Sequence, residues 1–201
     1  MRIFSILKIV AAVLLLTSVA VLPQTDGDKP AAAKQIKPAL LVIDIQNAFL
    51  PHMSESDTKL GMEMVNGAIW LFREYKLPII RIYHTNPGYG PKPGTDSFEF
   101  PKSVLINESD PKVIKTFPNA FIKTDLDKIL KEKDVNTVFL CGLSATGCVL
   151  ATYFGAQERE YKVFMIKDAI MSNESEYTHV IENISETITF ETMMFILDHI
   201  K

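Results

Sequence analysis

Apolar runs that alternate with segments of helical spacing most restrict the fold of this chain. The run ALLVIDI at 39–45 is apolar up to its carboxylate, and NTVFLCG at 136–142 and KVFMIK at 162–167 have similarly apolar centres. Runs without polar alternation suit strands that are buried on both faces of a parallel sheet. Repeated strand–helix units place helices on both faces of such a sheet. We therefore expect an α/β fold, a three-layer αβα sandwich around a mostly parallel, doubly wound, six-stranded sheet.

The expected elements alternate along the chain. Strands are predicted at 39–45, 78–84, 112–115, 136–142, 162–167 and 187–189. Helices are predicted at 57–75, 124–131, 148–159, 175–186 and 191–200. Residues 85–111 are rich in Pro and Gly, which indicates a loop, and loops of this length are often functional.

The first 37 residues have the composition of a leader and a tether. Arg2 and Lys8 precede an apolar run at 9–22, which only two hydroxyl residues interrupt. A basic start followed by a short apolar run is typical of an export signal, and this run is shorter than the roughly 20 residues that cross a bilayer. The protein would then be exported to the periplasm or secreted, or be held at the membrane by an uncleaved leader. We predict a signal peptide or N-terminal anchor at 1–22, a linker at 23–37 and one domain at 38–201.

Charge and composition exclude several classes of partner. The chain has 21 Lys and Arg against 24 Asp and Glu, a formal net charge of −3. A chain without a basic excess lacks the electrostatic signature of a nucleic-acid-binding protein. We therefore expect a small-molecule substrate, no nucleic acid, and membrane contact only through residues 1–22. The four histidines and two cysteines show no metal-ligand spacing, so neither a metal nor a cofactor is expected.

Polar residues end several predicted strands, and doubly wound sheets bind ligands at the carboxyl ends of their strands. Asp44 ends the most apolar run, where a carboxylate is costly to bury unless it is paired; a helix cap or turn residue is the alternative. Gln46 could orient Asp44 through a hydrogen bond. Lys115 has apolar neighbours in VIKTF, so its ammonium could pair with a carboxylate or stabilise a thiolate. His84 could line the pocket or be structural.

Cys148 follows a buried strand within CGLSATGCV, at the predicted start of a helix. Helix N-termini favour anions and lower the pKa of a thiol, and backbone N–H groups in a turn of small residues could receive an oxyanion. The alternatives are a small buried hydrophobe, a disulfide with Cys141, and a thiol redox pair. Cys141 lies inside the predicted strand, where a core role is expected.

Three strand-end motifs together resemble the isochorismatase-like cysteine hydrolase superfamily. They are Asp44 in LLVIDIQNAF, Lys115 in VIKTFPNAF and Cys148 in CGLSATGCVLAT, and Asp168 follows the strand in YKVFMIKDA. The resemblance covers the chain from residue 39 to the last helix and implies the αβα fold with an Asp-Lys-Cys triad. Cys148 would be the nucleophile, Asp44 the general acid and base, and Lys115 the cation that holds Asp44 and favours the thiolate.

The resemblance also implies details of the turn and of the assembly. A cis peptide bond is expected at Leu143–Ser144, and the backbone N–H groups of Ser144 and Cys148 would form the oxyanion hole. A homo-oligomer is expected, as in many members. Ala145 stands where many members carry Thr, and the metal-binding Asp-x-His element of nicotinamidases is missing, which argues against a bound zinc.

The function implied is hydrolysis of a C–N bond in a small amide, carbamoyl or ureido compound through a thioester on Cys148. The alternatives are an isochorismatase-type vinyl-ether hydrolase and a non-catalytic small-molecule binding module on the same fold. The residues expected to bind substrate are Gln46, Phe49, His84, Asn86 and Phe121.

Overall fold

The computed structural model describes residues 35–88 and 90–200. The strands are β1 (Pro38–Ile43), β2 (Ile79–His84), β3 (Lys112–Lys115), β4 (Thr137–Leu143), β5 (Lys162–Met171) and β6 (Thr187–Ile188). The helices are α1 (Glu55–Glu74), α2 (Leu126–Glu132), α3 (Leu150–Gln157), α4 (Ser175–Ile184) and α5 (Phe190–Asp198). Two short turns complete the set: the 3-10 turn η1 (Leu50–His52) and the π-helical turn η2 (Ala145–Val149). The predicted order of elements is confirmed, with shifted ends.

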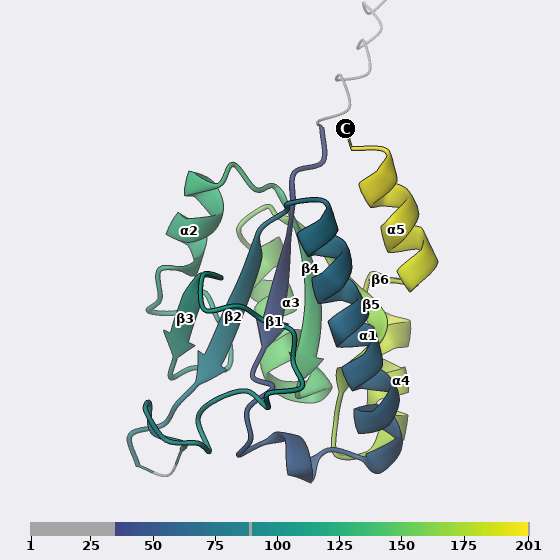
Figure 1. The fold of residues 1–201 in the computed structure, drawn as a ribbon. Coiled ribbons are helices and arrows are strands. Elements are labelled where there is room, and N and C mark those ends of the chain that lie inside the picture. Colours follow the sequence, from purple (N-terminus) through teal and green to yellow (C-terminus); the bar gives the residue numbers. More distant parts are fainter. Residues whose placement is uncertain (1–34, 89, 201) are drawn as a thin grey trace, which may run out of the picture. The chain divides into compact units, whose positions relative to one another are not determined.

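The six strands form one parallel sheet in the order β3-β2-β1-β4-β5-β6 (Figure 1). The chain runs outward from β1 to β3 and then returns to β4 on the other side of β1. The strand order therefore reverses between β1 and β4, which is where sheets of this kind bind ligands. Figure 1 shows the arrowheads of β2, β3 and β4 at the same end of the sheet, beside η1 and the segment that follows β2.

Two apolar clusters cover the two faces of the sheet. Ala39, Leu41 and Ile43 of β1 face the cluster that contains α2, α3 and α4 residues, whereas Leu40 and Val42 face the cluster with α1 and α5. Successive side chains of a strand point to opposite faces, so a strand covered on both faces offers no exposed position. The continuous apolar run of β1 follows from this, and the predicted αβα sandwich is confirmed.

β5 extends further than the sequence predicts. The expected end was residue 167, but the strand continues to Met171, and its pairing with β4 shifts register between Leu140 and Gly142. Asp168 lies inside this irregular strand with a φ of 61°, a left-handed conformation that Asp tolerates better than most residues. A bulge redirects a strand without ending it, so the polar Asp168 does not mark the end of β5.

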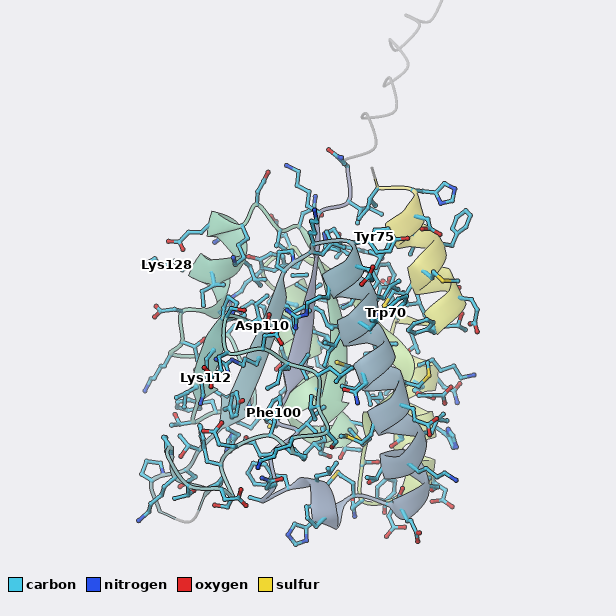
Figure 2. All side chains as sticks on the ribbon, in the orientation of Figure 1. Trp70, Tyr75, Phe100, Asp110, Lys112 and Lys128 are labelled. Atoms are coloured by element: carbon cyan, nitrogen blue, oxygen red, sulfur yellow. The ribbon has the colours of Figure 1, made fainter. Side chains whose placement is uncertain are left out.

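Among the described residues between β2 and β3, no helix or strand forms, as predicted, yet this segment is held against the sheet. Tyr83 of β2 stacks on Phe98 and Phe100, with ring centroids 5.0 and 4.3 Å apart. Arg73 of α1 donates two hydrogen bonds to the Asp110 carboxylate, at 2.8 and 2.9 Å. Figure 2 labels Phe100 and Asp110 in front of the sheet, and Phe100 belongs to the same apolar cluster as the buried residues of α1. The segment thus packs on β2 and α1 next to the carboxyl end of the sheet.

The predicted leader at 1–22 and nearly all of the predicted linker lie outside the described residues, and both stay predictions. The Gln35 side chain donates to Ile200 O at 3.3 Å, and the Lys37 N–H donates to Asn136 Oδ1 at 2.9 Å. The last linker residues therefore already contact the domain. Across residues 35–88 and 90–200, no helix has both the length and the apolar character that a membrane span requires.

Candidate active site

The end of β1 brings Asp44 to the switch point in an unusual backbone conformation. Asp44 directly follows β1, has a φ of 54°, and donates its N–H to Ile82 O of β2 at 2.9 Å. The neighbouring β4 can approach because Gly142 has no side chain: a Cβ there would lie 2.0 Å from Ile43 O. Gly142 also has a φ of 118°, which L side chains rarely adopt. The close packing of β1 and β4 thus requires this glycine.

Lys115 connects the polar groups of the site. It is the last residue of β3 and only 1% exposed. Its Nζ lies 2.7 Å from Asp44 Oδ2, 3.0 Å from Cys148 Sγ and 3.1 Å from His84 Nδ1. An ammonium has three N–H donors, so these three contacts use all of them. The structure therefore brings Asp44, Lys115 and Cys148 together.

Cys148 lies in the turn that follows β4. The peptide bond Leu143–Ser144 is cis, and η2 begins directly after it. The Ser144 carbonyl accepts hydrogen bonds from the N–H groups of Gly147 and Val149, at 3.0 and 3.2 Å. Cys148 was expected at the start of an α-helix, but it lies in this π-helical turn, and α3 begins two residues later. The turn directs Sγ back toward the ends of β1 and β3.

The electrostatics of the site differ from the sequence expectation. Burial is the main cause that raises the pKa of Cys148 to about 12, the charge of Asp44 raises it further, and Lys115 opposes both. Burial also raises the pKa of Asp44 above its usual range, against the attraction of Lys115. The expected lowering of the thiol pKa is wrong, because burial and the neighbouring carboxylate outweigh one cation. The raised pKa favours the protonated thiol at neutral pH.

The Asp44 carboxylate lies beside that thiol. Its Oδ2 accepts from Lys115, whereas its Oδ1 is buried without a hydrogen-bond partner. One donor atom each of Asp44, His84 and Cys148 lies within 4.8 Å of the other two. Such atoms could ligate zinc, but the Lys115 ammonium contacts all three residues. Lys115 therefore supplies the positive charge at the position where a metal ion would lie.

A pocket of about 260 Å³ opens onto these groups. Asp44, Ser144, Cys148, Phe49 and His84 line it as the sequence predicts, together with residues that the prediction missed, namely His52, Met53 and Leu143. The sequence feature that could have predicted Leu143 as a pocket residue is its position directly after Gly142, at the end of the buried strand. His52 and Met53 carry no such signal, because the packing of η1 decides where they lie.

Three residues predicted to bind substrate do not line this pocket. Gln46 is fully buried; its Nε2 donates to His84 O at 3.0 Å and its Oε1 accepts from His84 N at 2.7 Å. The Gln46 side chain therefore fixes the end of β2 and not the Asp44 carboxylate, whereas the Gln46 backbone N–H donates to Asp44 O at 2.7 Å. Phe121 is buried and stacks on Tyr161, and Asn86 Oδ1 accepts from the Gly88 N–H in its own turn.

Cys141 is separate from the site. Both cysteines are free thiols, so the predicted alternative of a disulfide is not what the structure shows. Cys141 is fully buried within β4, and its Sγ lies 3.6 Å from Leu41 O. It packs in the cluster on the α1 and α5 face, as expected of a core residue.

The fold and this strand-end cluster define a class: an αβα sandwich with a thiol, a carboxylate and an ammonium at its switch point. The model of the isochorismatase domain matches residues 38–192, and the chain belongs to this family of hydrolases. An uncharacterized isochorismatase family protein of Bacillus subtilis, YddQ, is 33% identical over 136 residues, 65% of this chain and 76% of that protein. An Arabidopsis thaliana protein named "Probable inactive nicotinamidase" is 29% identical over 154 residues, 65% of this chain and 79% of its own length.

Solved structures share the fold. An isochorismatase-like hydrolase from Alkaliphilus metalliredigens has a TM-score of 0.71 at 24% identity, covering 79% of this chain and 97% of its own. N-carbamoylsarcosine amidase from Thermoplasma acidophilum has a TM-score of 0.67 at 24% identity, covering 77% of this chain and 95% of its own.

Proposed function

We propose that this protein is a cysteine hydrolase that cleaves the C–N bond of a small amide, carbamoyl or ureido compound through a thioester on Cys148. The observation that carries the proposal is the position of Lys115 Nζ, 2.7 Å from the Asp44 carboxylate and 3.0 Å from the Cys148 thiol at the pocket wall. A nucleophile beside an oriented base is the arrangement that covalent catalysis needs. The similar fold of an amidase that is named for a carbamoyl compound supports the same reaction class.

In the first half-reaction, Cys148 Sγ attacks the carbonyl carbon of the substrate while its proton passes to Asp44. The C–N bond of the tetrahedral intermediate then breaks, and Asp44 returns the proton to the departing nitrogen. The backbone N–H groups of Ser144 and Cys148 would stabilise the oxyanion. The raised pKa of Asp44 suits this exchange, because a more basic carboxylate is a better proton acceptor and remains able to donate.

In the second half-reaction, water attacks the thioester carbon and gives its proton to Asp44. The C–S bond breaks, the acid product leaves, and the sulfur recovers its proton from Asp44. Lys115 orients Asp44 and stabilises the sulfur as it becomes anionic. The cycle consumes one water and releases one amine or ammonia.

The test is a hydrolysis screen over amides, carbamoyl amines and ureido acids with wild type, Cys148→Ala and Cys141→Ala. Removal of a nucleophile costs about 10⁴-fold or more in rate, so Cys148→Ala should be inactive with an intact fold. Cys141→Ala should keep its activity, because Cys141 is fully buried within β4 and is not among the residues that line the pocket. Acid-quenched wild type should show one acyl group on Cys148 by mass spectrometry. Full activity of Cys148→Ala would refute the mechanism.

A non-catalytic binding module is the second candidate, favoured by the relative that is named as inactive. The same screen separates the two. A wild-type protein that binds compounds of these classes without turnover and never forms the acyl adduct would be the binding module.

A further inference from the structure

The ammonium of Lys115 has no donor left for a substrate. Asp44, Cys148 and His84 each take one of its contacts, at 2.7, 3.0 and 3.1 Å, and an ammonium has three N–H groups. A substrate that enters this pocket therefore cannot hydrogen-bond Lys115 without displacing one of these partners. All three N–H groups of this cation are thus directed at Asp44, Cys148 and His84.

His84 lines the pocket with an uncharged ring. Lys115 Nζ lies 3.1 Å from His84 Nδ1. Because an ammonium can only donate, His84 Nδ1 accepts and the ring proton belongs on Nε2. Burial and the charge of Lys115 lower the pKa of His84 to about 4, so the ring is neutral at neutral pH. Gln46 fixes the backbone of His84 on both sides, and Phe49 packs on the ring edge to face at 6.1 Å between centroids.

Besides Asp44, His84, Cys148 and the hydroxyl residue Ser144, the pocket wall is mainly apolar. Phe49, Met53 and Leu143 surround the thiol, and His52 contributes an exposed imidazole at the rim. The residues that line this pocket include no Arg and no Lys, and Lys115 itself lies behind the lining. Asp44 is paired with Lys115, and the shifted pKa values of Cys148 and His84 favour their neutral forms, so these four groups leave no unpaired cation for an anionic substrate. A substrate carboxylate in this pocket would lose water without gaining a charged partner, which is costly.

We propose that this site selects small amides whose acyl group is uncharged and apolar, and that it rejects amides that carry a carboxylate. The inference rests on the proposed function and names the substrate class of that site. A pocket of about 260 Å³ is small for a ligand site, which limits the acyl group to a short alkyl chain or a single ring. The Nε2–H of His84 is the neutral donor that orients such a substrate.

Butyramide and succinamate test the proposal, because they differ only in a terminal methyl or carboxylate. We expect kcat/KM to favour butyramide by about 100-fold or more, given the cost of burying an unpaired charge. Met53→Arg should raise the succinamate-to-butyramide ratio at least tenfold, whereas Met53→Gln, which adds polarity without charge, should not. Equal or faster hydrolysis of succinamate by wild type would overturn the proposal while the hydrolase function stands.

Alkylation of Cys148 tests the same selectivity without turnover. Iodoacetamide and iodoacetate differ only in carrying an amide or a carboxylate. Iodoacetamide adds a carbamoylmethyl group to sulfur and iodoacetate adds a carboxymethyl group, and in both reactions iodide leaves and the thiol proton is lost. The iodoacetamide-to-iodoacetate rate ratio of Cys148 should exceed that of 2-mercaptoethanol by about tenfold or more, and Cys148→Ala should show no labelling. A ratio equal to that of 2-mercaptoethanol would overturn the proposal. If no amide is hydrolysed, the proposed function fails, and this ratio alone decides the selectivity of the pocket.

Discussion

The surroundings of Cys141 and Cys148 show what separates a core thiol from a candidate nucleophile in this fold. Cys141 lies within β4, fully buried, with the Leu41 carbonyl 3.6 Å from its sulfur. Cys148 lies in the turn after the same strand, with the Lys115 ammonium 3.0 Å from its sulfur. Burial raises the pKa of both thiols, that of Cys148 to about 12. A lowered pKa therefore does not distinguish the two.

The difference lies in the neighbouring groups. Cys148 lies beside the Asp44 carboxylate, one oxygen of which has no hydrogen-bond partner, and beside the Lys115 ammonium, which can stabilise developing negative charge. Cys141 has neither group among its described contacts. Reactive thiols are often recognised by a resting thiolate. In the proposed mechanism the thiol, whose pKa is raised to about 12, loses its proton only as it attacks, so its reactivity would depend on Asp44 more than on Lys115.

The largest effect should come from Asp44→Asn. The substitution keeps the shape and tolerates the positive φ of this position, but it removes the proton acceptor, so kcat should fall by about 10³-fold or more. Asp168→Asn is the matched control, since Asp168 also has a left-handed φ, of 61°, and lies outside the pocket wall. Steady-state kinetics of both variants measure the effect. Substantial activity in Asp44→Asn would transfer the role of base to another group.

Lys115→Met should have the next largest effect. Loss of the cation removes stabilisation of the sulfur and lowers kcat by about 10²-fold. It also leaves the Asp44 carboxylate buried without its partner, which costs about 3–5 kcal/mol of unfolding free energy while Asp44 stays charged. Lys112→Met, at the other end of β3, removes an exposed cation that lies over the Tyr83 ring and should cost about 1 kcal/mol or less.

Urea unfolding of the double variant Asp44→Asn, Lys115→Met separates the two roles of Lys115. Stability should return toward wild type, because the uncompensated charge is gone, while activity stays lost. A double variant as unstable as Lys115→Met alone would mean that Lys115 stabilises the fold by packing and not by its pairing with Asp44.

The sequence predicts the sheet and the meeting of Asp44, Lys115 and Cys148 better than it predicts the pocket. Strand-end residues such as Asp44 and Lys115 follow from apolar runs that the chain must bury, and the parallel topology brings their ends together. The side-chain contacts depend on packing that no local pattern records: Gln46 hydrogen-bonds the backbone of His84, and Met53 reaches the pocket through the turn η1. The pKa of Cys148 was mispredicted for the same reason, since one sequence neighbourhood does not reveal how deeply a thiol is buried.

The pH dependence of thiol labelling gives the smallest and most direct comparison of the two cysteines. Because the pKa of Cys148 is raised from 9.0 to about 12, its thiolate fraction rises with pH through and beyond pH 9. Iodoacetamide labelling of Cys148 should therefore accelerate by up to about tenfold per pH unit from pH 7 to 10 without a plateau. Cys141 is fully buried and should remain unlabelled in the folded protein.

Asp44→Asn sharpens this measurement, because the charge of Asp44 is one cause that raises the thiol pKa. Without that charge, Lys115 acts on the sulfur alone, and the labelling profile should move to lower pH, which peptide mapping by mass spectrometry at each pH would show. A wild-type rate that levels off below pH 8 would mean that Cys148 is a resting thiolate. The proton would then leave before the substrate binds, and Asp44 would serve only as the acid that protonates the leaving nitrogen.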